Sequence, residues 1–400
     1  MEYSTLRPWQ AINENGLIYD RGSLFAYFER IIDPRQARGK RYQLTTLLVI
    51  IFLAKLCGRD TPVEMADWAK NHAGELAQFL QLKRAWMPHH NTIRRVFQYI
   101  LEEAEFERLM QAYQQQQAQG GEQLAMDGKT LRGTRIGDRE PAGHVLSVYD
   151  VKAQRVLAQA AVDRKENEIV AAPRALAQVE LAGKIITGDA MHAQRALSAQ
   201  IVARGGDYLW VVKENQERLY QDIERLFAPD KPKPGFGKIT TDFLQAQTVN
   251  KGHGRIEKRQ IQTSTMLNDY VDWPGLGQVY RLERHFTWLR QGEVIKTSQE
   301  IEYGITSLAR EKALPKRVMQ VRRKHWLIET GLHYRRDVTF REDATRMTKG
   351  AAGRILATIH NVVLALIKQA GFQNAAQARR WFDGHLDQAF TLLVSGDSRL

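Results

Sequence analysis

The spacing of hydrophobic residues changes near residue 120 of this chain. Before that point apolar side chains recur every three or four residues, as they do in helices that bury one face. The segments 24–32, 44–57 and 93–110 show this spacing, and 44–57 is apolar enough to predict a buried helix. The pattern predicts a helical N-terminal domain over residues 1–120.

Two adjacent arginines, Arg94 and Arg95, lie near the start of the third helical segment. Asn91 precedes them and is expected to cap that helix. In a helix-turn-helix, residues at this position contact DNA, whereas in an ordinary helical bundle they form a solvated basic face. Both interpretations fit the sequence. The glutamine-rich stretch 111–121 predicts a linker and the domain boundary.

From Leu124 onward the pattern changes to short apolar or alternating segments, which predict strands. Strands are predicted at 124–127, 145–151, 155–162, 184–188 and 207–213, and helices at 166–179, 191–204 and 216–227. The first three strands follow one another directly, as in an antiparallel meander, and helices separate the others. This is the element order of a ribonuclease-H-like fold, an α/β architecture in which a mixed sheet has helices on both faces.

A β-rich segment interrupts this core. Its acids Glu257 and Glu302 alternate with apolar residues and are expected to face solvent. Strands are predicted at 239–248, 255–263, 279–289 and 300–305, and a helix at 314–336. The predicted organisation is a first core part at 121–230, a β-rich insertion at 231–308, the rest of the core at 309–372 and a C-terminal helical tail at 373–400.

Two aspartates follow predicted strands. Asp127 ends the apolar run that begins at Leu124, and Gly128 is expected to break the strand there. Asp189 follows the strand 184–188, at the carboxyl end where open α/β sheets bind their ligands. Two carboxylates side by side repel unless a divalent cation neutralises them. Because no cysteine accompanies them, the ligands favour Mg²⁺ or Mn²⁺ over zinc.

A two-metal site for phosphoryl transfer needs a third carboxylate, and Glu329 is the candidate. At 100° per residue it shares about one quarter of a helix circumference with four basic or imidazole side chains. These are Arg322, His325, His333 and Arg336. Residues 310–354 hold 13 Lys and Arg against 5 Asp and Glu, so this region suits phosphate groups.

The composition favours a polyanionic partner. The chain of 400 residues has a net charge of +13 and a pI near 9.7. Its single cysteine, Cys57, excludes an intramolecular disulfide and fits a reducing cytoplasm. The first residues lack the pattern of a signal peptide, and no apolar run is long enough for a membrane span, so no membrane partner is expected.

A set of motifs resembles the DDE transposases of bacterial insertion sequences, in the branch that contains the H-repeat-associated proteins. The resemblance runs from the first helices to about residue 370. The motifs are Asp127-Gly128-Lys129-Thr130, Asn167-Glu168-Ile169, Thr187 to His192 with Gln194, Asp207-Tyr208, Lys213 to Gln216, Gly252 to Glu257, His325 to Glu329, Leu332-His333, Asp337-Val338 and Glu342-Asp343.

The resemblance implies that Asp127, Asp189 and Glu329 are the metal-binding catalytic triad, on a ribonuclease-H-like core with a β-rich insertion before the glutamate. Where the wider group carries tyrosine, arginine and lysine around that glutamate, this chain has the triplet Arg322, His325 and Arg336. The expected DNA contacts are these three together with Arg94, Arg95, Lys129, Lys213, His253 and Arg255.

The implied activity is metal-dependent cleavage at the ends of a mobile element, followed by joining to target DNA. Its partners would be double-stranded DNA, both terminal inverted repeats and target, and a second copy of the chain or more. The expected location is the cytoplasm, associated with the nucleoid. Two alternatives stay open: a ribonuclease-H-like nuclease that cuts particular DNA structures without joining strands, and a DNA-binding descendant that has lost mobility.

Overall fold

The computed structural model describes residues 6–38, 40–118, 120–135, 142–163, 165–228, 241–252 and 254–396. The chain forms two compact units. Unit 1 consists of residues 1–120, 128–165 and 329–400, and unit 2 of residues 121–127 and 166–328. The chain therefore passes between the units at Gly120/Gly121, at Asp127/Gly128, at Lys165/Glu166 and at Ile328/Glu329.

The N-terminal part of unit 1 is mainly helical, as the sequence predicts. Its elements are β1 (Gln10–Ile12), β2 (Ile18–Asp20), α1 (Leu24–Phe28), α2 (Leu44–Leu56), α3 (Pro62–Asn71), α4 (Ala73–Phe79), α5 (His90–Arg95), the π-helix η1 (Val96–Ile100) and α6 (Glu103–Gln117). The expectation of helices throughout is wrong for β1 and β2, a short antiparallel pair. Three-residue strands are too short to show a periodicity in sequence.

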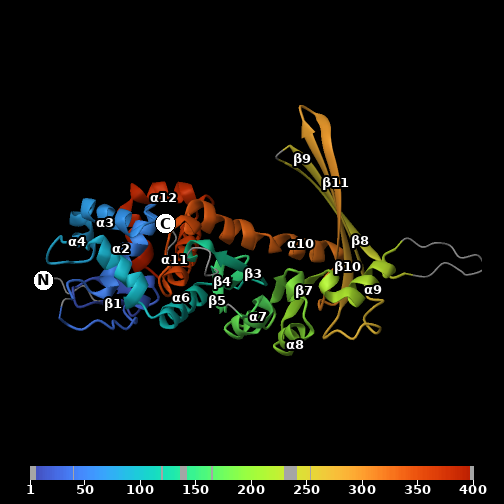
Figure 1. Ribbon diagram of the computed structural model, residues 1–400, viewed down its shortest axis with the longest axis horizontal. Coiled ribbons are helices and arrows are strands. Elements are labelled where there is room, and N and C mark those ends of the chain that lie inside the picture. The colour runs from blue at the N-terminus through green and yellow to red at the C-terminus, as the bar shows by residue number, and fades with distance from the viewer. Residues whose placement is uncertain are drawn as a thin grey trace, which may run out of the picture. The chain divides into compact units, whose positions relative to one another are not determined.

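Helix α2 lies at the centre of this part of unit 1. Every residue from Thr46 to Leu56 is buried, which confirms the buried helix predicted over 44–57. Helices α1 and α3 pack against it from the N-terminal side of the sequence, and α11 (Ala352–Gln369), α12 (Ala375–Asp383) and α13 (Leu386–Val394) from the C-terminal side (Figure 1). A helix that is apolar all round needs such cover on every side.

The predicted helix over 93–110 is divided. Regular helix ends at Arg95, the π-helix η1 follows, and α6 begins anew with Glu102 accepting hydrogen bonds from the Ala104 and Glu105 amides. The cap of α5 is His89, whose Nδ1 accepts from the Asn91 amide, so the expectation that Asn91 caps this helix is wrong.

The predicted glutamine linker is also wrong, because α6 continues to Gln117. The amides of Gln111, Gln114 and Gln115 donate to backbone carbonyls of Gln159, Asn361 and Leu157, at 3.3, 3.2 and 2.8 Å. Glutamine is a good helix former, and these contacts satisfy its polar end where the helix is buried. Composition alone does not separate such a face from a linker.

Unit 1 also contains β4 (Gly143–Asp150) and β5 (Arg155–Val162), an antiparallel pair. Strand β3 (Gln123–Leu131) is the neighbour of β4, and its second half belongs to unit 1. The strand therefore continues through Gly128, contrary to the expected break, and Lys129 and Leu131 are buried in its continuation. Within the part of the chain that the structure describes, no helix is long and apolar enough to cross a membrane.

Unit 2 contains the parallel part of the sheet. The first half of β3 pairs in parallel with β6 (Ile185–Gly188), and β6 pairs in parallel with β7 (Asp207–Val212). Helices α7 (Glu168–Ala177), α8 (Arg195–Ala203) and α9 (Glu217–Leu226) lie between and after these strands in the sequence. The predicted strands and helices agree with them within a few residues. The mixed α/β architecture is therefore confirmed.

Four long antiparallel strands complete the sheet of unit 2. They are β8 (Leu244–Gly252), β9 (Arg255–Ser264), β10 (Gln278–Arg290) and β11 (Glu293–Thr306), in the order β7-β11-β10-β9-β8. The outer ends of β10 and β11 extend beyond the helices of the unit as an arm (Figure 1). Their turn is Gln291-Gly292, with positive φ at both residues, as two-residue hairpin turns require.

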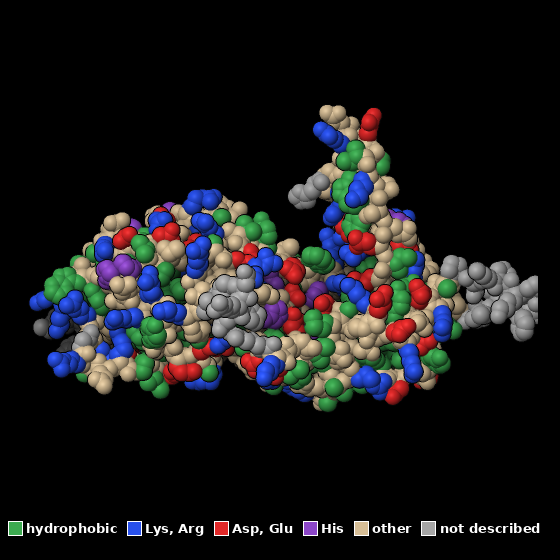
Figure 2. Space-filling model, viewed as in Figure 1, with side chains coloured by type: hydrophobic (Ala, Val, Ile, Leu, Met, Phe, Trp, Pro, Cys, Tyr) green, Lys and Arg blue, Asp and Glu red, His purple; other side chains and the backbone are tan. Residues whose placement is uncertain are grey.

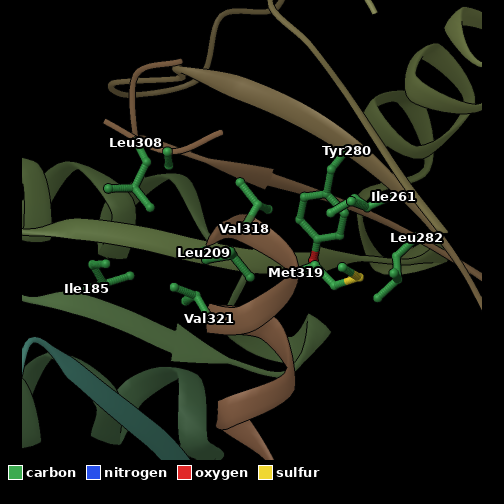
Figure 3. Close-up of a cluster of buried hydrophobic side chains, with 10 residues drawn as sticks. Ile185, Leu209, Ile261, Tyr280, Leu282, Leu308, Val318, Met319 and Val321 are labelled. Carbon is green, nitrogen blue, oxygen red and sulfur yellow. The ribbon is translucent and has the colours of Figure 1, made fainter. Parts of the chain in front are cut away.

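Helix α10 (Pro315–His325) covers one face of these strands. Figure 3 shows Val318, Met319 and Val321 of this helix directed toward Leu209, Ile261, Tyr280 and Leu282 of the sheet. All of these side chains are buried. The core of unit 2 thus joins the parallel strands and the four antiparallel strands to the helix that precedes Glu329.

Candidate metal centre and DNA-contacting residues

The parallel pairing of β3 and β6 determines where the two aspartates lie. Ala125 is opposite Thr187 in this register, and Asp127 and Asp189 each follow two residues later. Asp189 therefore directly follows β6, and Asp127 lies within β3 just beyond the last residue pair of the two parallel strands. The carboxyl ends of parallel strands are where α/β sheets bind ligands. Asp127 is half-buried, whereas 55% of the Asp189 side chain is exposed.

The backbone after β6 holds Asp189 in place. One carboxylate oxygen, Oδ1, accepts a hydrogen bond of 3.0 Å from the Met191 amide, which begins a turn of 3₁₀-helix at Ala190–His192. This bond uses one lone pair and leaves the exposed side of the carboxylate open to a cation. Carboxylate oxygens without cysteine suit Mg²⁺ or Mn²⁺, so the donors at this sheet edge fit a divalent metal.

A buried imidazole lies beside Asp189. His192 is not exposed at all, and its Nε2 is 3.3 Å from the Glu168 carboxylate and 3.9 Å from that of Asp189. Asn167 caps α7 by accepting from the Ile169 amide, as the sequence suggests. Glu168 does more than complement the helix dipole, because it faces His192. Both residues belong to conspicuous sequence motifs, but nothing in those motifs indicates that the two side chains meet.

His325 occupies a second buried position near the end of β6. Its Nδ1 is 3.1 Å from the hydroxyl oxygen of Thr187. Burial, assisted by the charge of Arg322 and by His192, lowers the pKa of His325 to about 3. The imidazole is therefore neutral at physiological pH, and the phosphate contact predicted for it is not supported.

Arg322 is engaged inside the protein. Its Nε and Nη2 each donate to a carboxylate oxygen of Glu302 at 2.7 Å, and both side chains are largely buried. Burial disfavours the charged form of Arg322, but the attraction of acidic groups, chiefly the Glu302 carboxylate, is the stronger effect and raises the pKa of Arg322. Glu302 is thus not the solvent-facing acid that was expected, and neither is Glu257, which is buried and 2.5 Å from Arg259.

Glu329 begins the last segment of unit 1 and is exposed. It is the first residue of a π-helix, η5 (Glu329–His333), and a second π-helix, η6 (Arg335–Thr339), follows. The Nδ1 atom of His333 is 3.9 Å from the Glu329 carboxylate. The helix predicted over 314–336 is confirmed in extent, but it is regular α-helix only to His325, and π-turns change the angle per residue from Glu329 onward.

Arg336 lies inside unit 1. Its exposed fraction is 0%, and its guanidinium donates to Glu342 at 2.9 and 2.7 Å and to Asn361 at 3.3 Å. The DNA contact predicted for Arg336 is not supported, because no phosphate reaches a fully buried guanidinium. Lys129 is buried as well and forms an ion pair with Asp337.

Four other cations are exposed. Arg94 and Arg95 lie on α5, Lys213 follows β7, and Arg255 begins β9. Arg255 lies over the Phe286 ring, 5.0 Å from its centroid. His253, the remaining predicted DNA contact, lies outside the described residues.

An open groove of about 740 Å³ adjoins the Asp189 end of the sheet within unit 2. Ala190 and Met191, which directly follow Asp189, form part of its wall, and Lys213, Arg284 and Glu302 line it as well. Lys213 therefore lines the same groove as the two residues that directly follow Asp189. The position of Lys213 suits contact with a ligand that the two aspartates bind.

Comparison with known families identifies the class. Residues 118–366 match the family model described as the transposase DDE domain, and residues 25–114 match the DDE_Tnp_1-associated model. The first match spans more than half of the chain. This chain therefore belongs to the DDE-domain transposase family.

Its relatives include proteins of the H-repeat group. The chain is 31% identical over 355 residues to the putative transposase YncI of Escherichia coli O157:H7, covering 86% of this chain and 87% of that protein. It is 27% identical over 387 residues to the H repeat-associated putative transposase YhhI of Escherichia coli strain K12, covering 94% and 98%.

One solved structure shows a remote likeness. It is a cryo-EM structure of the piggyBac transposase synaptic complex with hairpin DNA, with a TM-score of 0.45 and 10% identity over 91% of this chain and 76% of that one. A likeness of this strength carries no argument about the present chain.

Proposed function

We propose that this protein is a DNA transposase that cuts the ends of an insertion sequence and joins them to target DNA by metal-dependent phosphoryl transfer. The observation that carries the proposal is the position of Asp127 and Asp189, each two residues beyond the last pair of two adjacent parallel strands. Membership of the transposase family supplies the substrate class.

The proposed core is ribonuclease-H-like. The strand order β5-β4-β3-β6-β7 supports this, because three strands consecutive in sequence are followed by two that helices connect in parallel. The strands β8–β11 form the β-rich insertion before the last catalytic residue.

The proposed metal ligands are Asp127, Asp189 and Glu329. Divalent cations held by these residues would activate the nucleophile and stabilise the leaving oxygen. Water attacks the phosphodiester at the end of the element, and the released 3′-hydroxyl then attacks target DNA. No covalent protein intermediate is needed, so no serine, tyrosine or cysteine nucleophile is assigned.

The other residues divide into two groups. His192 with Glu168, His325 with Thr187, and Arg322 with Glu302 stabilise the strand ends that carry the aspartates. The proposed DNA contacts are the exposed cations Lys213, Arg255, Arg94 and Arg95, together with His253. Lys129 is a contact only if its ion pair with Asp337 opens.

The proposed partners are double-stranded DNA at the terminal inverted repeats and at the target. Because two ends must be joined, at least two copies of the chain are expected in the DNA complex.

The test uses the DNA that flanks the gene. Purified protein with Mg²⁺ would be incubated with a plasmid carrying both flanks and, separately, with a plasmid in which the flanks are scrambled. The proposal predicts cuts only at matched inverted repeats and joining of the released ends to a second plasmid. Cutting of branched DNA without joining would instead identify a structure-specific nuclease, and binding without cutting in Mg²⁺ or Mn²⁺ a descendant that has lost mobility.

A further inference from the structure

A second groove, with a volume of about 470 Å³, lies in the N-terminal part of unit 1. It is formed where the chain enters α2 and where it passes from α4 to α5. Its lining residues are Asn15, Arg41, Tyr42, Gln43, Thr46, Leu82, Lys83, Arg84 and Trp86. None of the residues assigned above to catalysis or DNA contact belongs to it.

The groove is strongly basic. Arg41, Lys83 and Arg84 are all exposed, and the lining contains no acidic side chain. Among the residues that the structure describes, none forms an ion pair with these three cations within 4 Å, although Arg35 and Lys40 nearby in sequence both pair with Asp33. Three uncompensated cations around one concave surface attract a polyanion.

An exposed tryptophan completes the groove. Trp86 is 60% exposed, and the guanidinium carbon of Arg84 is 4.8 Å from its ring centroid. This cation–π contact holds the Arg84 guanidinium beside the ring. The segment 82–87, which carries Arg84 and Trp86, is held in place by a hydrogen bond of 2.9 Å from the Tyr42 hydroxyl to the Met87 carbonyl. The groove is therefore formed before any ligand arrives.

Basic side chains also surround this region. Arg94 and Arg95 are exposed on the helix that follows the 82–87 segment. Figure 2 shows Lys and Arg side chains gathered over the N-terminal helices of unit 1. The groove thus belongs to a part of unit 1 that carries further exposed cations.

We propose that this groove binds the sugar–phosphate backbone of duplex DNA, separately from the aspartate-bearing sheet edge. The inference rests on the proposed function, because it assumes that DNA is the partner. Arg41, Lys83 and Arg84 contact phosphate oxygens, and Trp86 orients the Arg84 guanidinium. Contacts of this kind position a duplex without selecting its sequence.

The test measures binding apart from catalysis. The Asp189→Asn protein, without cleavage, would be titrated onto a short fluorescein-labelled duplex of arbitrary sequence, and anisotropy followed over a range of salt concentrations. Adding Lys83→Ala and Arg84→Ala should lower the affinity about tenfold and reduce the slope of log K against log salt by roughly two, because each substitution removes one phosphate-binding cation. Trp86→Ala should weaken binding less, and Trp86→Phe should restore most of it.

A matched control removes the same charge elsewhere in unit 1. Arg108→Ala with Arg380→Ala deletes two exposed arginines outside the groove. If the groove variant loses no more affinity or salt dependence than this control, the groove is not a DNA site. The same conclusion follows if its loss of affinity appears on single-stranded DNA only.

The two proposals fail separately. If wild-type protein cuts and joins matched ends while the groove variant binds duplex normally, the transposase proposal stands and the groove inference falls. If groove variants lose duplex binding while wild-type protein neither cuts nor joins any DNA, the groove inference stands and the transposase proposal falls. Absence of duplex binding by the parent protein overturns the groove inference directly.

Discussion

Arg336 and Glu342 form a buried, bidentate ion pair, with two parallel hydrogen bonds of 2.9 and 2.7 Å. The exposed fractions of the two side chains are 0% and 4%. Although burial opposes charge, Arg336 and His360 hold the pKa of Glu342 far below its usual range. Through the bonds of Arg336 to Asn361 and of Glu342 to His360, the pair also connects η6, which follows the segment of Glu329, to α11.

Removal of one partner from this ion pair should destabilise the folded protein. Arg336→Met leaves the Glu342 carboxylate buried with only His360 as a partner, and the free energy of unfolding should fall by about 3–5 kcal/mol. Urea denaturation followed by circular dichroism measures the change. The double variant Arg336→Met with Glu342→Leu should recover much of the stability, and equal destabilisation by single and double variants would contradict this expectation.

Stability should also fall on mild acidification because of His360. Its Nδ1 is 2.6 Å from Glu342, and burial, together with the charge of Lys55, lowers the pKa of His360 to about 4. The unfolded chain therefore takes up a proton near pH 6.5, whereas the folded protein does so only near pH 4. The contribution of His360 to stability is therefore fully present above pH 6.5 and decreases by up to about 1.4 kcal/mol per pH unit as the pH falls from 6.5 to 4.

The variant His360→Gln isolates this contribution. It keeps an N–H donor for Glu342 but does not titrate, so its unfolding free energy should vary less steeply between pH 6.5 and pH 4. Urea titrations at several pH values measure both slopes. Equal slopes for the two proteins would show that another group takes up the proton.

The triad variants should separate chemistry from binding. Asp127→Asn, Asp189→Asn and Glu329→Gln should each nearly abolish cleavage of the terminal repeats and leave duplex affinity and thermal stability largely unchanged, because each removes one metal ligand. Cleavage in Mg²⁺ and anisotropy on the same DNA measure both properties.

Substantial cleavage by Glu329→Gln would show that the third ligand is another acid. Glu302 and Glu342 are poor substitutes, since each is buried in an ion pair with arginine. Glu168, which faces His192 beside Asp189, would be the next residue to change.

Arg94 and Arg95 test the helix-turn-helix interpretation. Both are exposed on α5, a helix of only six residues. Their double replacement by alanine should weaken binding to the terminal repeat. Loss of preference over random DNA would indicate base contacts, and a uniform loss with a smaller salt slope would indicate phosphate contacts. Unchanged affinity would assign both arginines to an ordinary solvated face.

Arg255 tests the role of the β-rich insertion. Its guanidinium lies over Phe286 and is 3.8 Å from the buried Glu257, so it is oriented but still exposed. Arg255→Ala should impair cleavage or joining more than initial binding, and Arg255→Lys should restore only part, because lysine lacks the planar fork. Activity within a few-fold of wild type in both steps would identify a structural turn residue.

The regular elements could be predicted because their signals are local. The alternation in 155–162 and the apolar run in 207–213 match β5 and β7 closely. The β3–β6 register cannot be read from the sequence, yet one aspartate after each of two predicted strands was enough to predict neighbouring carboxylates. Asp189 does follow the end of its strand, whereas Asp127 lies within β3, which continues to Leu131.

The errors have a common physical origin in tertiary partners. Arg322 and Arg336 look like phosphate contacts in sequence, but Glu302 and Glu342 neutralise them from positions that no helical wheel reveals. Gln111 and Gln114 look like linker residues until the carbonyls that accept their amide protons are known. The sequence shows the charge and polarity of each side chain, whereas the fold determines which groups that side chain contacts.

The burial of α2 has a consequence for the order of synthesis. Helices α11, α12 and α13, which cover α2 on one side, leave the ribosome long after α2 because they follow it far along the sequence. Until they emerge, a helix without a polar face stays uncovered and is a target for chaperones and proteases. A truncated product that retains both aspartates but lacks these helices should therefore be degraded more readily than a chain that contains them.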